Sequence, residues 1–156
     1  MAKRTGLART EALIENLKRD INLGGSTVRT KKVVTVITGT KTLTAEDSGT
    51  LFMVQASGDA AYTITLPSAS TSAGVYFTFI MGNTASENVL IDSGTGNGIR
   101  GMTVGAATEA NISNNLIRVV GGTSIRGDRV DLHCDGSRYW CHNFQQADDA
   151  VIGANS

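Results

Sequence analysis

The chain has 156 residues, a length typical of one globular domain, and 14 Lys or Arg residues balance 14 Asp or Glu residues. Apolar residues make up 40% of the sequence but aromatic residues only 5%, so the core must be built mainly from Val, Ile, Leu and Ala. No apolar run approaches the ~18–20 residues of a membrane span and no signal-peptide pattern opens the chain, which predicts a soluble protein made in the cytoplasm with no membrane partner.

The balanced charge hides an asymmetry along the chain. Residues 1–32 hold eight Lys or Arg and three acidic residues, a net charge of +5, and the remaining 124 residues carry −5. This predicts docking between subunits or onto an acidic partner surface, although a solvated terminus would have the same composition. No nucleic-acid partner is expected, because the basic arm has no aromatic side chain for base stacking and the acidic body matches its charge.

Within this arm the sequence predicts one amphipathic helix at 11–23. Thr10 is a suitable N-cap and Gly24-Gly25 a suitable stop. The apolar residues with helical spacing are Leu13, Ile14, Leu17 and Ile21. An isolated helix of this length is marginal in water, so its apolar stripe must be covered by this subunit, a neighbouring one or a partner.

After a linker at 24–32, alternating apolar and polar residues predict an all-β domain over 33–145, followed by a C-terminal tail at 146–156. Turn clusters separate the runs, and DGSR at 135–138 is the clearest hairpin turn. We expect half-buried antiparallel strands in a β-sandwich or jelly-roll-like body. The expected strands are 33–38, 41–45, 50–55, 61–66, 75–81, 88–92, 98–104, 115–120, 128–134 and 138–144.

The hairpin around 135–138 carries four potential metal ligands, His133-Cys134 and Cys141-His142. Adjacent strand residues point to opposite faces, so each face would hold two of these ligands, whereas a structural zinc site needs four. No metal or other cofactor is therefore expected. A disulfide between the cysteines requires them to lie opposite each other, and assembly in the cytoplasm favours two buried thiols instead.

Catalytic patterns are weak, and the chain is not expected to be an enzyme. No Gly-x-Ser-x-Gly elbow is present, and the glycine-rich SGTGNG at 93–98 lacks the lysine and the helix of a phosphate loop. Acidic pairs fall in predicted turns or the tail, where solvated carboxylates are the default, although a glycosidase pair from distant strands would leave no sequence trace. These pairs are Glu46-Asp47, Asp128/Asp131 and Asp148-Asp149.

Tyr139 and Trp140, beside the predicted turn, allow two interpretations. Together they could form a platform on which a sugar ring stacks. Alternatively, one ring belongs to the core and the other covers the edge of the sheet.

Several runs resemble a β-domain that recurs in tailed-phage virion proteins: KTLTAEDSGTLF at 41–52, AYTITLPS at 61–68 and AGVYFTFI at 73–80. The stretch 117–140 is similar to the "GDRV-x-L-x-x-DG-x-x-W/Y" ending of that domain, except that its cysteine hairpin departs from the usual Val/Ser pattern. Such domains occur in capsid decoration (cement) proteins and as modules of tail fibres. The opening RTGLARTEALIENLKRDINL looks like the N-terminal helix of the free-standing decoration type.

The resemblance implies a capsid decoration protein that lies on the virion exterior and bridges capsomers. The expected partners are the major capsid protein and further copies of this chain, which should form a homotrimer. The alternative it leaves is a tail-fibre or receptor-binding module that recognises host surface glycans. For decoration, attachment is expected through the arm and the helix. The expected binding residues are Lys3, Arg4, Arg9, Leu13, Ile14, Leu17 and Ile21.

Overall fold

The computed structural model describes residues 33–56, 58, 60–94, 98–105, 109–147 and 149–154. The predicted helix at 11–23 and all seven expected binding residues lie outside these ranges. In the described part, strands and two short 3-10 turns, Ala45–Asp47 and Ala69–Thr71, make up the regular structure. None of its helical segments has the length and apolar character needed to cross a membrane.

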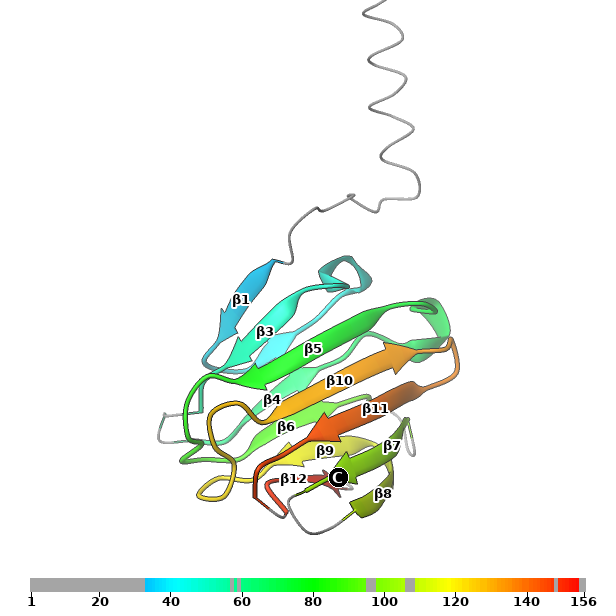
Figure 1. The fold of residues 1–156 in the computed structure, drawn as a ribbon. Coiled ribbons are helices and arrows are strands. Elements are labelled where there is room, and N and C mark those ends of the chain that lie inside the picture. Colours follow the sequence, from blue (N-terminus) through cyan, green and yellow to red (C-terminus); the bar gives the residue numbers. More distant parts are fainter. Residues whose placement is uncertain are drawn as a thin grey trace, which may run out of the picture. The chain divides into compact units, whose positions relative to one another are not determined.

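Two β-sheets pack face to face, which confirms the predicted β-sandwich (Figure 1). The large sheet has seven strands, in the order β1 (Val34–Ile37), β3 (Leu51–Val54), β5 (Tyr76–Met81), β10 (Arg129–Cys134), β11 (Tyr139–Phe144), β7 (Ile99–Val104) and β8 (Glu109–Asn114). The small sheet has five, in the order β12 (Val151–Ala154), β9 (Leu116–Val119), β6 (Val89–Asp92), β4 (Tyr62–Thr65) and β2 (Lys41–Thr42).

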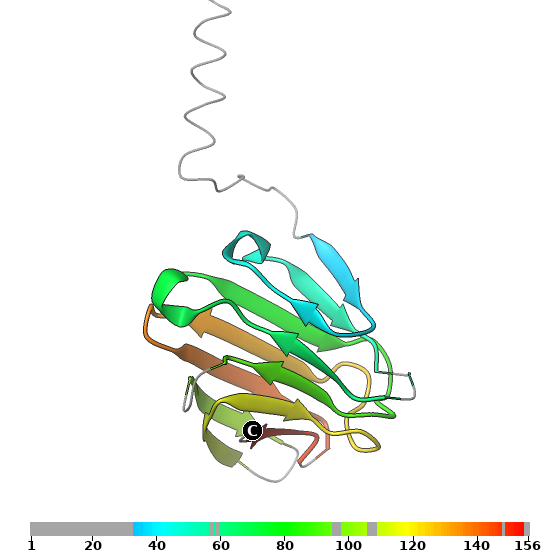
Figure 2. The ribbon, with the colours of Figure 1, turned by 180° about the vertical axis from the view of Figure 1, so that it is seen from behind.

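The strand directions differ from the prediction, because both sheets are mixed rather than antiparallel. From β1 to β6 the chain passes to the opposite sheet after every strand, as Figures 1 and 2 show from the two sides. As a result β1, β3 and β5 run parallel in the large sheet, and β2, β4 and β6 run parallel in the small one. Parallel neighbours need a crossover connection, and here a strand of the opposite sheet forms part of each one.

Antiparallel pairing is confined to the second half of the chain and to its junction with the first. β10 pairs antiparallel with β5 and β11, β7 with β8, and β9 with β6 and β12. The predicted hairpin at 135–138 is confirmed, with Cys134 opposite Tyr139. Two strands were not predicted: β8, and β12 in the segment expected to be a tail, where Val151 is fully buried.

The core lies between the two sheets and follows the alternation of the strands. Phe52, Phe77 and Phe79 are at most 3% exposed, and the rings of Phe52 and Phe79 stack with their centroids 5.3 Å apart. Leu132, beside Phe77 in the large sheet, and Ile64 of the small sheet point into the same interior with no exposed surface. Three of the four phenylalanines in the chain thus meet in one place, which concentrates the scarce aromatic surface where burial stabilises the fold most.

Asp128 departs from the expectation of a solvated carboxylate, because it is only 2% exposed. Its Oδ2 accepts hydrogen bonds from the Ser124 hydroxyl (2.8 Å) and the Ile125 amide (2.9 Å), and its Oδ1 accepts one from the Gln146 amide (2.9 Å). The preceding Gly127 has φ +99°, a conformation that favours glycine. The Gly-Asp pair therefore ties the 124–128 turn to the end of β11.

Candidate interaction surface

The face of the large sheet that points away from the small sheet is the most unusual surface of the described structure. We call it the outer face. The registers align its side chains in rows across the strands, for example Tyr76, His133, Trp140 and Arg100 in one row and Val36, Met53, Ile80, Arg129, Phe144 and Val104 in another. A third row runs from Val34 and Leu51 through Thr78, Asp131 and His142 to Met102.

Large apolar side chains are exposed on this face rather than scattered over the molecule. Of the seven exposed large hydrophobic residues in the described part of the chain, six belong to the outer face. They are Val34 (55% exposed), Val36 (52%), Tyr76 (40%), Met102 (42%), Trp140 (45%) and Phe144 (56%). A whole aromatic side chain has a surface of about 150–250 Å², and an aliphatic one somewhat less. Because roughly half of each side chain is exposed, the six together expose on the order of 500 Å². This area is divided between two groups of side chains on either side of β10, and exposed apolar groups on a protein surface are often functional.

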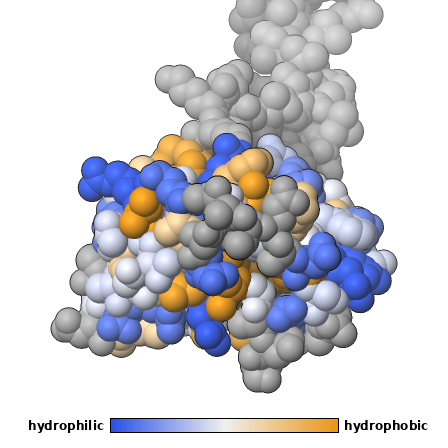
Figure 3. All heavy atoms as spheres, turned by 60° about the horizontal axis from the view of Figure 1, so that its bottom comes forward, coloured by the Kyte–Doolittle hydropathy of each residue, from blue (hydrophilic) through white to orange (hydrophobic). Residues whose placement is uncertain are grey.

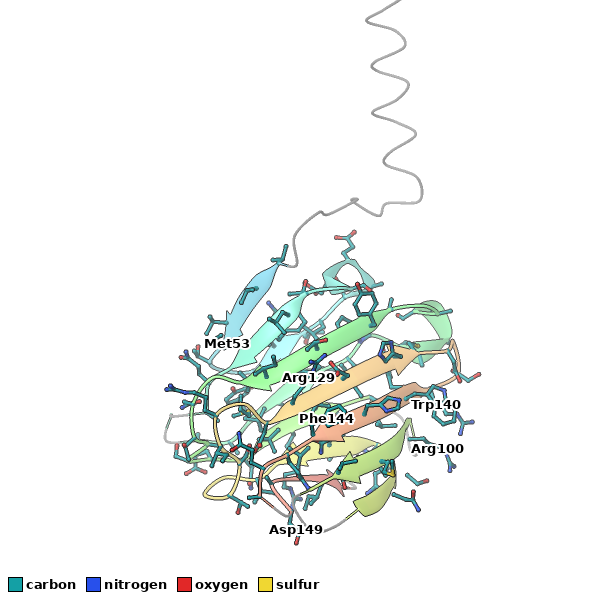
Figure 4. The ribbon with its side chains drawn as sticks, viewed as in Figure 1. Met53, Arg100, Arg129, Trp140, Phe144 and Asp149 are labelled. Carbon is teal, nitrogen blue, oxygen red and sulfur yellow. The ribbon has the colours of Figure 1, made fainter. Side chains whose placement is uncertain are left out.

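The outer face has two chemically different halves. The aliphatic half lies on β1, β3 and β5 and consists of Val34, Val36, Leu51, Met53 and Ile80, with no charged residue among the outward positions of these strands. The aromatic half lies on β11 and β7 and consists of Trp140, Phe144 and Met102, with His142 and Arg100 among them. Figure 4 shows Met53 in the first half, Phe144, Trp140 and Arg100 in the second, and Arg129 between them.

Strand β10 separates the halves and carries the charges at the centre of the face. Arg129 Nε lies 2.8 Å from Asp131 Oδ2, with the two side chains 44% and 14% exposed. Asp131 Oδ1 and Arg100 Nε are buried atoms without a hydrogen-bond partner in the described structure. The centre of the face is thus polar, and its cation and anion are paired with each other.

The view in Figure 3 brings forward the side of the molecule that lies at the bottom of Figure 1, around β7, β8 and β12, and gives a different picture of the surface. There, apolar side chains reach the surface in small groups interrupted by hydrophilic ones. This mixed pattern is normal for protein surfaces, on which single apolar residues need no special explanation.

The two rings beside the hairpin turn have opposite environments, so the two-ring platform does not form. Tyr139 has no exposed surface, and its hydroxyl donates to the Pro67 carbonyl oxygen over 2.7 Å. Burial raises the pKa of Tyr139 well above its usual value. Trp140 points outward, near Tyr76 and His133, whose rings stack with centroids 6.0 Å apart. The interpretation with one core ring and one surface ring is the right one.

Asp135 of the turn fixes the Trp140 ring. Its Oδ2 accepts a hydrogen bond from the indole nitrogen over 2.7 Å, and its Oδ1 accepts from the amides of Ser137 (2.7 Å) and Arg138 (2.9 Å). These bonds stabilise the charged carboxylate, first the one from Trp140, and lower the pKa of Asp135 to about 2. The exposed Trp140 is therefore held in one orientation.

The histidines and cysteines of the hairpin separate as strand geometry predicts. His133 and His142 lie on the outer face, whereas Cys134 and Cys141 are buried and free. The cysteines are not directly opposite, because Cys141 pairs with Leu132 in the register. Burial raises the pKa of the Cys141 thiol to about 12. In the described ranges no three His, Cys, Asp or Glu residues gather in a group that could hold a metal ion.

The acidic residues singled out in the sequence have separate settings in the described structure, and Asp148 lies outside the described residues. Asp47 lies in the first 3-10 turn and accepts hydrogen bonds from the backbone and hydroxyl of Thr44, as a helix-start cap does. Asp128 holds a turn and Asp131 pairs with Arg129, so these carboxylates have structural partners. Asp149 is exposed and has φ +59°.

Comparison with known proteins gives no match: no family model matches the chain, and no curated protein or solved structure is significantly similar to it. The functional argument therefore rests on this chain's own residues.

Proposed function

We propose that this chain is a structural protein of a tailed-phage virion, a decoration protein on the capsid exterior that stabilises the head by bridging capsomers. The observation that carries the proposal is the apolar outer face of the large sheet, since such a face is suited to lasting protein contacts rather than to turnover of a small substrate. Many weak contacts repeated over a particle would resist internal pressure through avidity.

The sequence runs that resemble phage β-domains support this proposal through the fold they build. Gly127 and Asp128 of the GDRV motif form the buried turn network, and Asp135 and Gly136 form the hairpin turn, where Gly136 has φ +93°. These four motif residues maintain the scaffold, so the proposal gives them no attachment role. Attachment is therefore assigned to parts of the chain outside the motif.

The proposed attachment segment is the basic arm with its apolar stripe. Burying one Leu or Ile is worth roughly 1.5–3 kcal/mol, whereas an exposed ion pair contributes about 0–1 kcal/mol. Leu13, Leu17 and Ile21 should thus dominate the affinity for the shell, while Arg4 and its basic neighbours set the salt dependence.

The test uses undecorated capsids and the purified full chain. Deleting residues 1–23 should leave a folded β-body that no longer binds the particles, and Leu17→Asp should come close to this loss. Arg4→Ala is the matched mild variant and should weaken binding only slightly. Full decoration by the truncated protein would refute the role of the arm, and no binding of the intact chain to any capsid would refute the proposed function.

A glycan-binding tail module is the second candidate, and the fixed, half-exposed Trp140 favours it. An indole ring held by Asp135 beside Tyr76 and His133 offers a flat surface on which a sugar ring can stack. Binding of bacterial surface glycans that is lost in Trp140→Ala, together with only a few copies per virion, would favour this function. Hundreds of copies per virion would favour decoration.

A further inference from the structure

We propose that the aromatic half of the outer face binds a short saccharide that carries a carboxylate, with Trp140 stacking on a sugar ring and Arg100 pairing with the carboxylate. The inference names the ligand class of the second candidate function and rests on that function, and it is independent of decoration. The saccharide site consists of Trp140, Arg100, Ser113 and Asn111, on three neighbouring strands of the large sheet.

The strand registers bring these four residues together on one face. Trp140 on β11 pairs with Arg100 on β7, and Arg100 pairs with Ser113 on β8, two residues after Asn111. Ile112 lies between the two β8 residues and is only 3% exposed, so they point outward. Neighbouring strands lie about 4.8 Å apart, so the row from Trp140 to Ser113 spans about 10 Å. The site therefore has the scale of a small saccharide rather than of a folded protein, and Figure 4 shows Trp140 and Arg100 on their adjacent strands.

Trp140 offers a ligand its ring but no hydrogen bond. The side chain is 45% exposed, and its one polar atom, the indole nitrogen, already donates to Asp135 Oδ2 over 2.7 Å. Asp135 is itself held by the amides of Ser137 and Arg138, so the ring is already ordered when a ligand arrives. A sugar ring has an apolar face of C–H groups, which gains from stacking on an indole without a hydrogen bond from it.

Arg100 supplies a cation that the fold does not neutralise. It has no ion-pair or hydrogen-bond partner among the described residues, and its Nε is a buried atom. Arg129 on the same face differs, because it is paired with Asp131. Arg100 as a whole is partly exposed, so the end of its guanidinium can be reached from solvent. Two parallel hydrogen bonds from that end to a carboxylate are the geometry that a guanidinium favours.

Ser113 and Asn111 add neutral polar groups beside this cation. Both side chains are exposed, and within the described residues neither makes a side-chain hydrogen bond. A hydroxyl and an amide both donate and accept, as recognition of sugar hydroxyl groups requires. The site thus matches three parts of an acidic sugar, which are its C–H face, its carboxylate and its hydroxyl groups.

Two other classes of anionic ligand fit this site less well. An extended acidic peptide binds a sheet by adding a strand at an edge, but β11 and β7 are paired on both sides and offer no edge. A nucleic acid carries a phosphate at every nucleotide, whereas the site provides one unpaired arginine on a body, residues 33–156, with a net charge of −5. A short saccharide with few carboxylates avoids both problems.

The first experiment titrates the full chain with two acidic probes, sialyllactose and digalacturonate, and with their uncharged methyl esters. Trp140 is the only tryptophan in the chain, so a saturable change in tryptophan fluorescence reports on the site itself. We expect at least one of the acids to bind, and its ester to bind about tenfold more weakly or worse. Added salt should weaken binding of the acid and leave binding of the ester unchanged.

Variants then test the two roles separately, with calorimetry as the readout and circular dichroism as the check of folding. Arg100→Gln should reduce binding of the acid to the level of its ester, and Arg100→Lys should restore part of the difference. Trp140→Ala should abolish binding of both, whereas Trp140→Phe should retain part of it. Arg118→Gln is the matched control, because Arg118 is also partly exposed but lies at an outward position of β9 in the small sheet. This control should bind like the wild type.

Each contrary result overturns the inference in a distinguishable way. If acid and ester bind equally and Trp140→Ala abolishes both, the site takes neutral sugars, and the second candidate function stands without the carboxylate. If an oligoglutamate peptide or oligothymidylate binds more tightly than both acids, the ligand is not a saccharide. If neither acid gives a fluorescence change or a binding heat at millimolar concentration, or if Arg100→Gln binds the acid like the wild type, the site does not recognise a carboxylate. Decoration is tested separately, by the binding of the chain to capsids.

Discussion

The buried carboxylate of Asp128 gives the sharpest prediction about stability. Asp128→Ala removes the acceptor of three hydrogen bonds, from Ser124, Ile125 and Gln146, at a position that is only 2% exposed. Each hydrogen bond to a charged group contributes about 1.5–3 kcal/mol, but the variant also escapes the cost of burying a carboxylate. We therefore expect a net loss of about 3–5 kcal/mol in the free energy of unfolding.

The measurement is thermal unfolding followed by circular dichroism at low micromolar concentration. For a chain of this length 1 kcal/mol corresponds to roughly 2–4 °C, so the melting temperature should fall by roughly 6–20 °C. Asp128→Asn keeps the shape and one acceptor oxygen and should lose an intermediate amount.

Asp131→Ala is the matched control, since this aspartate lies three residues further on and pairs with the half-exposed Arg129. Its loss should be about 0–1 kcal/mol. Equal losses at the two aspartates, or an Asp128→Ala variant as stable as the wild type, would refute the structural role assigned to the buried turn.

Three further changes test the local geometry. Gly101→Ala should prevent stable pairing of β7 with β11, because the added Cβ would overlap the carbonyl oxygen of Cys141. In the control Gly39→Ala the added Cβ meets no atom within 4 Å, so in denaturant this variant should unfold like the wild type and Gly101→Ala should not. The Cys141 thiol should resist a thiol reagent at pH 8 in the native protein and react only after unfolding, since burial raises its pKa to about 12; rapid native reaction would contradict this. Trp140 is the only tryptophan in the sequence, and its fluorescence should change when acid protonates Asp135. Because the pKa of Asp135 is lowered to about 2, the contribution of the Trp140–Asp135 hydrogen bond to stability is complete above pH 4 and is lost as the pH falls from 4 to about 2. Asp135→Asn should abolish that transition, and a midpoint near pH 4 would show that the contact is weak in solution.

The positions of the strands could be predicted from the sequence, but not all of their partners. Alternation with a period of two marks each strand and its buried side, because the side chains of a strand point to its two faces in turn. Short connections such as that between β3 and β4 are compatible with the antiparallel neighbours that we expected, yet they carry the chain across the sandwich. Alternation contains no information on which sheet the next strand joins, so the parallel pairing was missed. In β8 Ile112 is the only large apolar residue, so the pattern was too weak to detect.

The outer face was missed for a related reason. In the run VVTVI at 33–37 both sets of alternating positions contain apolar residues, and such a run is usually assigned to a strand buried on both sides. A usable signal did exist at the hairpin: the tight turn places Cys134 opposite Tyr139, and Leu132 and Cys134 face inward. Tyr139 must then face inward and Trp140 outward, which could have been worked out before the structure.

The alternation of the chain between the sheets has a consequence for how this protein folds. Val34 pairs with Leu51, Leu51 with Thr78, and Lys41 with Ile64, so pairing in this half of the body joins residues 17 to 27 positions apart. The entropy of closing these loops is lost before any contact is gained, and a high contact order predicts slow formation. The β10–β11 hairpin closes over only a few residues and can form early, but it needs β5 beside it. Strands β1 to β6 should therefore assemble in one cooperative step on a hairpin that the ribosome makes after them.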